Sequence, residues 1–182
     1  MKILLSFFCI LLSIVVRQSS LISIEENPIS RTLEVDNFRA QLNGLITGDG
    51  IAPLLEGEAL VINLWATWCG PCIREIPKLN KLVEKYQDQG VRFLAFTDES
   101  KEVFEKFQIR RPSFEFRFEK SFANLEALRI LMALDKKYHG RAIPVHILVK
   151  KDGTVKDAFV GGSKYDIRRL ESFIKKEIKI KK

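Results

Sequence analysis

The sequence predicts an α/β fold in which helices cover both faces of a central, mixed β-sheet. Stretches of strand length alternate with stretches whose apolar residues recur at helical spacing, a pattern typical of strands joined by helices. The segment EALVINLW, residues 58–65, is apolar at nearly every position, as expected of a strand buried on both faces. Residues 144–162 carry Asp152 and Gly153 between two strand patterns, which predicts a β-hairpin and an antiparallel end to a sheet that begins parallel.

Length and composition are typical of one well-cored domain. The chain has 182 residues, of which 46% are hydrophobic and 29% are charged. That is enough for a single core and too short for two large domains. The net charge of +7 gathers toward the C-terminal stretch IKKEIKIKK. We interpret this stretch as a solvated helix end and not as a nucleic-acid surface, because no aromatic residues interleave with the basic ones.

The N-terminal segment MKILLSFFCILLSIVVRQSS has the pattern of an export signal. Lys2 precedes 14 uncharged residues, 3–16, and Arg17 follows them. This length matches the apolar region of a secretory signal and is short for a membrane span. Because no convincing small-residue cleavage site follows, we expect residues 1–20 to be a signal peptide or a membrane anchor. The protein is then expected outside the cytoplasm, in the periplasm or on the outer face of the cytoplasmic membrane.

Residues 21–50 are weakly patterned and contain the turn signals NPIS and NGLITGDG. We predict that they form a connector or N-terminal extension, with an edge strand near 29–35. The predicted domain then occupies residues 51–182.

The first half of this domain reads as two strand–helix units. After the strand at 58–65, a helix is predicted from Pro71, which suits a first helical turn, to the DQG turn. A second strand is predicted at 91–97 and a second helix at 98–108, with Asp98 or Ser100 as its cap. The apolar stripe of the first helix consists of Ile73, Ile76, Leu79, Leu82, Val83 and Tyr86.

The second half adds another strand–helix unit, the hairpin and a closing helix. FEFRF, residues 114–118, alternates as a strand does, and residues 121–138 have helical character throughout. The segment is dense in phenylalanine, and we favour packing of these rings against the sheet over a partner-binding surface. The final helix is predicted at 166–178, with an apolar stripe facing the sheet.

Two cysteines remain once the leader is set aside, Cys69 and Cys72. A disulfide between them closes too small a loop to restrain the unfolded chain, so a purely structural bridge is not expected. A zinc site needs three or four ligands, and the sequence adds only His139 and His146. We interpret His146, inside an apolar strand, as a satisfied core histidine. No metal site is predicted, and a redox pair is the best interpretation.

The placement of the pair supports redox chemistry. Cys69 falls where a buried strand gives way to a helix, and the free N–H groups and dipole of a helix N-terminus stabilise a thiolate. A thiolate is the species that attacks a disulfide. Cys72 lies one turn further in, so we assign Cys69 as the attacking and Cys72 as the resolving thiol. Trp68 is expected to shield one side, and Gly70-Pro71 to form a stiff connection.

These residues carry a resemblance. WCGPC after a buried strand, followed about 70 residues later by IPVHILVKKDG, resembles the thioredoxin superfamily. Within it, NLWATWCGPCIREIP is most similar to the TlpA/ResA-like thiol–disulfide oxidoreductases, over residues 50–180. The resemblance implies a thioredoxin-like three-layer sandwich, an N-terminal extension and a strand–helix insertion within FEFRFEKSFANLEALRI.

The resemblance also implies roles for four further positions. Ile143 and Pro144 match the cis-proline loop that faces the cysteines and offers backbone groups to a substrate chain. Asn63 stands where ordinary thioredoxins have a buried aspartate. In the similar branch a glutamate of an E-x-P motif takes the neighbouring role, and Glu75-Ile76-Pro77 matches that motif. Glu75 is then expected to exchange a proton with Cys72, which requires a buried carboxyl group.

The expected function is an extracytoplasmic thiol–disulfide oxidoreductase, a reductase of protein disulfides. It needs no cofactor beyond the redox-active disulfide Cys69–Cys72, since the dithiol carries both electrons. The residues between the cysteines include no histidine, which favours a reducing centre. Expected partners are a disulfide-bearing client protein and an upstream membrane thiol donor, with a possible membrane tether and no nucleic acid.

Two alternatives stay open at this stage. A copper-delivery protein on the same fold would use Cys69, Cys72 and His146 as metal ligands. A thiol peroxidase would need a peroxidatic cysteine in a Thr-x-x-Cys setting, and the residues around Cys69 argue against it.

Overall fold

Five strands form one mixed sheet in the structure, a computed structural model that describes residues 38–180. The strands are β1 (Ala59–Leu64), β2 (Val91–Thr97), β3 (Glu119–Phe122), β4 (Val145–Val149) and β5 (Val155–Val160). Their order across the sheet is β3-β2-β1-β4-β5. β2 is parallel to β1 and β3, whereas β4 is antiparallel to β1 and β5. The predicted mixed sheet, parallel at first and closed by a hairpin, is confirmed.

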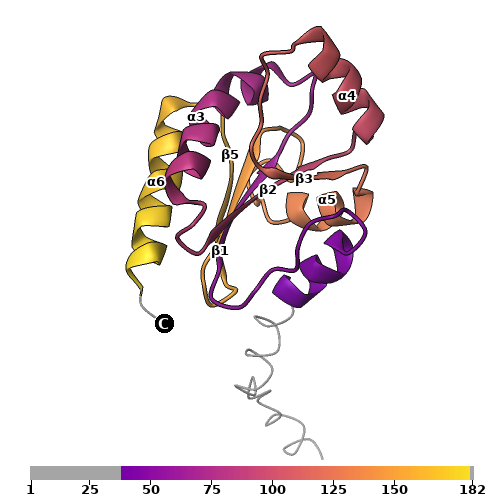
Figure 1. Cartoon of the computed structure of the whole chain (residues 1–182). Helices are drawn as coiled ribbons and strands as arrows, with labels where there is room; N and C mark the ends of the chain where they lie inside the picture. Colours follow the sequence, from indigo (N-terminus) through magenta and orange to yellow (C-terminus); the bar gives the residue numbers. More distant parts are fainter. Residues whose placement is uncertain (1–37, 181–182) are drawn as a thin grey trace, which may run out of the picture. The chain divides into compact units, whose positions relative to one another are not determined.

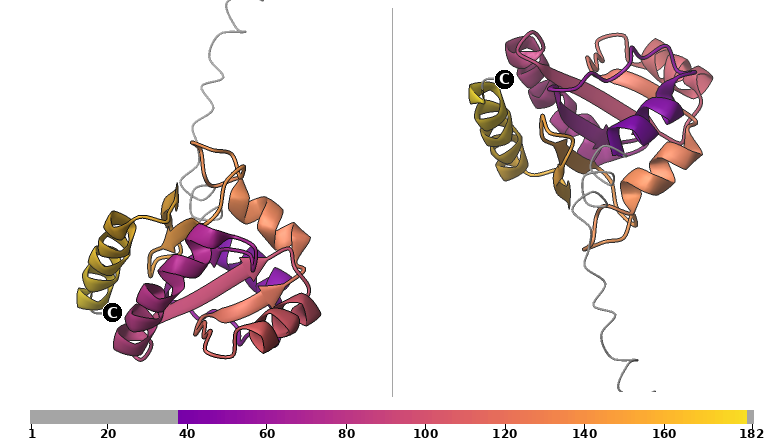
Figure 2. Two further views of the ribbon diagram at one scale, coloured as in Figure 1. Left: turned by 90° about the horizontal axis from the view of Figure 1, so that it is seen from above. Right: turned by 90° about the horizontal axis from the view of Figure 1, so that it is seen from below.

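Helices cover both faces of this sheet, as Figure 1 and Figure 2 show. They are a helix over residues 38–46, α3 (Gly70–Tyr86), α4 (Lys101–Arg110), α5 (Leu125–Met132) and α6 (Lys164–Lys179). α3, α4 and α6 contribute to one apolar layer, and the helix at 38–46 and α5 contribute to the other. The sheet between two helical layers confirms the predicted three-layer α/β architecture.

The central strand positions the functional part of the chain. All six residues of β1 are buried, and β1 pairs with β2 on one side and β4 on the other. Its single polar residue, Asn63, is fully buried and lies opposite Ala95 of β2 and His146 of β4. A polar side chain at the centre of a sheet requires hydrogen-bond partners nearby. β1 therefore fixes both the start of α3 and the place of a buried polar group.

The segment 114–118 corrects a prediction. It forms no strand, and the strand β3 begins directly after it, at Glu119. The side-chain amide of Asn80 hydrogen-bonds the backbone of this segment, as a neighbouring strand would. Its Nδ2 donates to Glu115 O over 2.8 Å, and its Oδ1 accepts from Arg117 N over 3.0 Å. The alternation of the sequence reflects phenylalanine rings packed inward, with Phe116 and Phe118 buried. The side chain of Asn80, and not a neighbouring strand, therefore hydrogen-bonds the backbone here.

The phenylalanines of this segment pack against the sheet, as predicted. Phe114 stacks on Trp65 with ring centroids 6.3 Å apart and meets Phe107 edge-on at 4.9 Å. Phe116 contacts the same tryptophan edge-on at 5.1 Å. Such edge-on and offset pairs add to the stabilisation from burial itself.

The helix predicted at 121–138 is also shorter than expected. Ser121 and Phe122 belong to β3, and Ala123 has a left-handed backbone with φ 52°. Asn124 caps α5 by accepting from Ala127 N. After Met132 the chain turns, and the carboxylate of Asp135 accepts from two backbone N–H groups of that turn. Asparagine and aspartate favour caps and turns for this reason.

A helix in the predicted connector packs on the sheet. Over residues 38–46, Leu42 and Ile46 are buried against the second apolar layer. The buried guanidinium of Arg39 donates to the carbonyl oxygens of Leu55 and Glu58, both at 2.8 Å. These charged hydrogen bonds hold the helix against the loop that leads into β1. The domain boundary at residue 51 stays a prediction.

The predicted leader, residues 1–20, and the predicted edge strand near 29–35 lie outside the described residues. Between residues 38 and 180, no helix combines the length and the apolar composition that crossing a membrane requires.

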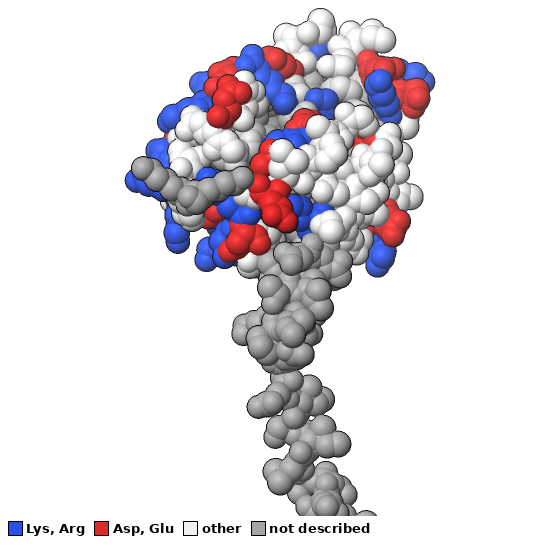
Figure 3. Space-filling model, turned by 60° about the horizontal axis from the view of Figure 1, so that its bottom comes forward, with Lys and Arg blue, Asp and Glu red and all other residues white. Residues whose placement is uncertain are grey.

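Charged side chains of both signs are mixed on the face of the molecule that Figure 3 draws. Figure 3 shows lysines and arginines interspersed with aspartates and glutamates on that face. Mixed charge of this kind is typical of an ordinary soluble surface.

α6 closes the fold against α3. Its N-terminus carries a capping box in which the side chain of Ser163 and the carboxylate of Asp166 accept backbone hydrogen bonds. Near its middle, Glu171 accepts from Lys85 Nζ over 2.9 Å and from the hydroxyl of Tyr86 over 2.8 Å. These contacts join α6 to the last turn of α3, the helix that carries the cysteines.

Glu171 predicts a stability that depends on acid pH. Hydrogen bonds from Lys85, Tyr86 and Lys175 lower the pKa of Glu171 from 4.5 to about 2. A carboxyl pKa lowered by folding stabilises the protein above pH 4.5, and that contribution is lost as the pH falls toward 2. In urea unfolding, Glu171→Gln is expected to be less stable than the parent at pH 6 and equal to it near pH 2. A difference that stays constant over this range contradicts the prediction.

Candidate active site

The two cysteines form a disulfide at the N-terminus of α3. Cys69 is the N-cap residue, with an extended backbone, and its Sγ accepts from the backbone N–H of Cys72 over 3.2 Å. Cys69 Sγ is therefore placed at the positive end of the helix, as the sequence predicts. Cys69 is 3% exposed and Cys72 is fully buried. The small exposed fraction of the pair belongs to Cys69.

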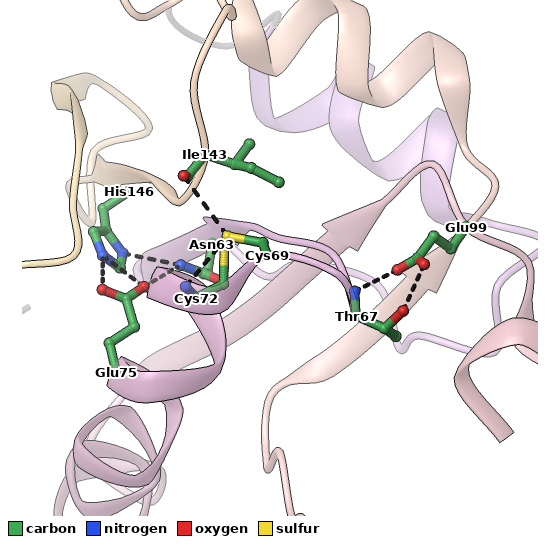
Figure 4. Close-up of a disulfide and its surroundings, with 8 residues drawn as sticks. All are labelled: Asn63, Thr67, Cys69, Cys72, Glu75, Glu99, Ile143 and His146. Carbon is green, nitrogen blue, oxygen red and sulfur yellow. Dashed lines mark hydrogen bonds and ion pairs between the residues drawn. A yellow bond between two sulfur atoms is a disulfide. The ribbon is translucent and has the colours of Figure 1, made fainter. Parts of the chain in front are cut away.

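A loop from the other end of the chain faces the disulfide. The carbonyl oxygen of Ile143 lies 3.7 Å from Cys69 Sγ, as Figure 4 shows. The peptide bond between Ile143 and Pro144 is cis, as the resemblance implies. The carbonyl oxygen of Pro144 accepts from Gly161 N over 2.8 Å, which ties the loop to the segment after β5. Backbone groups of this loop therefore lie beside the sulfur that is expected to react.

Two glycines allow that segment to approach the site closely. A Cβ atom at Gly161 would lie 2.4 Å from the ring atoms Cδ2 and Nε2 of His146. Gly162 has φ +103°, and a Cβ there would meet Pro71 at 3.5 Å and Pro144 at 4.0 Å. The close approach at Gly161 and the backbone conformation at Gly162 both favour glycine. The glycine pair thus packs against the disulfide loop, the cis-proline loop and His146.

A buried polar cluster lies on the Cys72 side of the disulfide (Figure 4). Asn63 Nδ2 lies 3.3 Å from Glu75 Oε1 and 3.2 Å from His146 Nδ1. His146 Nε2 lies 3.2 Å from Glu75 Oε1 and 3.3 Å from Oε2. Glu75 is 4% exposed and the other two are fully buried. Cys72 and Glu75 are three residues apart on α3 and therefore share a helix face.

Glu99, in the loop after β2, fixes the chain segment that leads into the cysteines. Its carboxylate accepts from Thr67 N over 2.5 Å and from Thr67 Oγ1 over 2.6 Å (Figure 4). The backbone N–H of Glu99 in turn donates to the hydroxyl of Thr97, and its carbonyl oxygen accepts from Ala123 N. Hydrogen bonds to a carboxylate are among the stronger ones in proteins. The chain two residues before Cys69 is therefore fixed to the end of the second strand.

A pocket of about 280 Å³ opens beside the disulfide loop. Trp68 contributes a side chain that is 70% exposed, and Ile143 contributes the cis-proline side. Leu128 and Met132 of α5 complete an apolar wall. The inserted strand–helix unit thus reaches the site through α5, while its phenylalanines pack in the core.

The site contains most residues that the sequence singled out and several that it did not. Trp68, Gly70, Pro71 and the cis-proline loop lie around the disulfide, and Glu75 is buried behind it. Sequence reasoning missed Glu99 and the glycine pair 161–162. The GG dipeptide after a strand was the available signal for the glycines, whereas nothing local marks Glu99.

His146 has its predicted core position, fully buried on β4. Both of its ring nitrogens face protein partners, Asn63 and Glu75. Within residues 38–180, no group of three or more histidine, cysteine, aspartate or glutamate side chains is arranged to hold a metal ion.

The sheet order, the disulfide at a helix N-terminus and the facing cis-proline loop define a thioredoxin-like protein with a dithiol–disulfide centre. The model of the AhpC/TSA family matches residues 49–158, more than half of the chain, and the protein belongs to that family.

Two known relatives identify the branch of the family that the chain resembles. Thiol-disulfide oxidoreductase ResA of Geobacillus kaustophilus is 36% identical over 121 residues, which cover 64% of each protein. Thiol-disulfide oxidoreductase ResA of Bacillus anthracis is 29% identical over 128 residues, 67% of this chain and 65% of the relative. The chain thus spans slightly less than two thirds of the length of these relatives. The resemblance to ResA-like proteins is confirmed.

Solved structures confirm the fold. A Chlorobium tepidum protein described as a thiol:disulfide interchange protein DsbE is 25% identical, with a TM-score of 0.56 over 68% of this chain and 82% of that one. A thioredoxin family protein from Chlorobium tepidum TLS, 21% identical, has a TM-score of 0.55 over 68% and 81% of the two chains.

The Glu99 contact predicts a local stabilisation of the disulfide loop. Glu99→Ala leaves the backbone N–H of Thr67 without its partner, and we expect the free energy of unfolding to fall by about 2–3 kcal/mol. Glu99→Gln retains an acceptor and is expected to lose less than half of that. Urea unfolding of the oxidised protein measures both, with Glu105→Ala, on the exposed face of α4, as a control expected within about 0.5 kcal/mol of the parent. Equal stability of Glu99→Ala and the control contradicts the prediction.

Proposed function

We propose that the protein is a thiol–disulfide oxidoreductase that reduces disulfides in client proteins. The observation that carries the proposal is the Cys69–Cys72 disulfide at the N-terminus of α3, opposite the carbonyl oxygen of Ile143. The names of the ResA relatives support the reaction class. The disulfide is the whole redox centre in this proposal, and no further cofactor is invoked.

The proposed reaction has two exchange steps. The Cys69 thiolate of the reduced protein attacks a client disulfide, forms a mixed disulfide and expels one client thiolate. Cys72 then attacks Cys69 Sγ, closes the Cys69–Cys72 bond and expels the second client thiolate. Two electrons pass from the dithiol to the client, and the proton of the Cys72 thiol has to leave. Cys69 is the first nucleophile because it is the partly exposed sulfur and accepts the helix N–H of Cys72.

Glu75 is the proposed acceptor of the Cys72 proton. It shares a face of α3 with Cys72, and its carboxylate accepts from Asn63 Nδ2. A general base must lie within reach of the proton that it takes, directly or through one water molecule. The buried position of Glu75 excludes the surface role that composition alone would suggest.

The cis-proline loop and the adjacent pocket are the proposed client-binding surface. Ile143 O, now beside Cys69 Sγ, is available to accept a backbone N–H of an extended client segment. The apolar wall formed by Trp68, Leu128 and Met132 suits a side chain next to the client cysteine.

The proposed place of action is outside the cytoplasm, with a membrane thiol donor supplying electrons. The support is the leader pattern in residues 1–20 and the absence of histidine between the cysteines, which favours a reducing dithiol. Copper delivery through His146 is disfavoured because both ring nitrogens already face protein partners.

Activity and direction are tested together. We expect the reduced protein to cleave the interchain disulfides of insulin and to have a reduction potential well below about −120 mV, the value of a strong oxidant. Cys69→Ser is expected to abolish turnover. Cys72→Ser is expected to arrest as a mixed disulfide on Cys69, which mass spectrometry detects. Absence of both insulin cleavage and the mixed disulfide would remove the proposed function.

The proton role of Glu75 predicts a slower second step. Glu75→Gln keeps the size and polarity of the side chain but cannot take a proton at neutral pH. We expect resolution by Cys72 to slow about 100-fold while attack by Cys69 changes little, because general bases typically contribute at least that factor. Rapid-mixing kinetics of mixed-disulfide formation and decay separate the two steps. An unchanged decay rate contradicts the role.

A further inference from the structure

We propose that His146 is a positioning residue for Glu75: it holds the carboxylate oriented to accept the Cys72 proton. The inference rests on the proposed function of Glu75 and adds a residue from a distant strand, β4, to the proton-transfer machinery. The geometry that carries it is the buried cluster of Asn63, Glu75 and His146.

The hydrogen-bond pattern assigns the proton on the histidine ring. An asparagine Nδ2 can only donate, so His146 Nδ1, 3.2 Å away, has to accept. The ring then carries its proton on Nε2, which faces both carboxylate oxygens of Glu75 at 3.2 and 3.3 Å. The reverse orientation of the Asn63 amide would turn Oδ1 toward the Glu75 carboxylate. Two hydrogen-bond acceptors would then face each other, which is unfavourable.

Both recorded side-chain contacts of Glu75 are therefore donors. Asn63 Nδ2 donates to Oε1, and His146 Nε2 donates to the carboxylate. Donors stabilise a carboxylate, whereas burial without donors favours the protonated carboxyl. Of these two donors, the imidazole is the one that reaches both oxygens. Loss of His146 therefore removes the donor that reaches both oxygens and leaves the carboxylate without the contact that orients it toward its task.

The imidazole ring of His146 has little freedom to rotate away from Glu75. Gly161 lies so close that a Cβ atom there would be 2.4 Å from Nε2, and Phe159 packs on the ring with centroids 5.5 Å apart. β4 itself is fixed against β1, with His146 directly opposite Asn63. The surrounding elements therefore hold the imidazole in the orientation in which Nε2 faces Glu75.

The groups around the pair define its pH dependence. β1 contributes Asn63, and β5 contributes Phe159, neither of which titrates. α3 contributes Cys72, which titrates when reduced. From α6, the guanidinium of Arg169 lies over the Phe159 ring and is paired with Asp157. Among the described residues, the recorded charged or titratable neighbours are thus Cys72 and, beyond the phenylalanine, this ion pair.

His146 supports the proton transfer that accompanies closure of the Cys69–Cys72 disulfide. The Cys72 sulfur attacks Cys69 Sγ in the mixed disulfide, the bond between Cys69 and the client breaks, and the client sulfur leaves as a thiolate. The thiol proton of Cys72 passes to the Glu75 carboxylate, which becomes a carboxylic acid. Its proton is released before the next cycle, when the donor dithiol reduces the protein again. His146 exchanges no electron and breaks no bond.

Rapid mixing with dithionitrobenzoate tests the proposal. The full-length reduced chain carries Cys9→Ser, so that Cys69 and Cys72 are its only thiols. Attack by Cys69 releases one coloured thiolate, and resolution by Cys72 releases a second. For His146→Leu we expect the second phase at pH 7 to slow at least about tenfold, as loss of a hydrogen bond to a charged group implies. The first phase is expected to stay within twofold and shows that the variant is folded.

The pH profile separates positioning from a merely structural role. In His146→Leu the slowing is expected to shrink as the pH rises, because a Cys72 thiol that loses its proton to solvent no longer needs a positioned base. His146→Gln offers an amide donor and is expected to recover most of the rate. His139→Asn, at the other histidine of the chain, is the matched control and is expected to change neither phase.

A double variant shows whether His146 acts through Glu75. Adding His146→Leu to Glu75→Gln is expected to slow the second phase no further, since the group that it positions is already absent. An additional full slowing, an unchanged second phase in His146→Leu, or a lower melting temperature with an unchanged pH profile would each overturn the proposal. Failure to reduce insulin with these phases intact would instead count against the proposed function alone.

Discussion

The start of α3 at the end of β1 is the constraint on which the rest of the site depends. β1 is buried along its whole length between β2 and β4, so its end cannot shift without breaking two ladders. Cys69 follows as the N-cap, and its sulfur accepts a hydrogen bond from the backbone N–H of Cys72 in the first turn of the helix. The Glu99 carboxylate holds Thr67 between strand and cap. The position and the electrostatic environment of Cys69 Sγ are thus set by the end of β1, the N-terminus of α3 and the Glu99 carboxylate.

Burying the polar cluster behind this sulfur costs desolvation free energy, which hydrogen bonds within the cluster offset. A carboxyl, an amide and an imidazole removed from water are stabilised only through one another. Asn63 Oδ1 remains without a hydrogen-bond partner among the described residues, as does Trp65 Nε1. Unsatisfied buried groups are few in folded proteins and tend to mark functional positions. The cluster lies on the Cys72 side of the disulfide, where the proposed proton transfer would take place.

Regular elements followed the local pattern of the sequence, and the irregular ones did not. The apolar runs of β1 and β2, the helical stripe of α3 and the Asp152-Gly153 turn mark their own structures because each depends on neighbours in the chain. The strand at 114–118 and the long helix at 121–138 failed. At 114–118 the backbone hydrogen-bonds with the side chain of Asn80 and not with a strand. At 121–138, β3 takes the opening residues and Asn124 caps a shorter helix.

The sequence by itself determined the cysteine pair and the helix start that holds it, because spacing and local propensity encode both. The cis-proline position followed from the resemblance to a known family. The resemblance also marked Glu75, through its motif. Only the tertiary structure decided what surrounds them. Asn63 and His146 meet through the antiparallel register of β1 and β4, 83 residues apart, and His146 meets Glu75 across 71. Such contacts arise from how strands pair and how helices cover them, and no local pattern in the sequence encodes that arrangement.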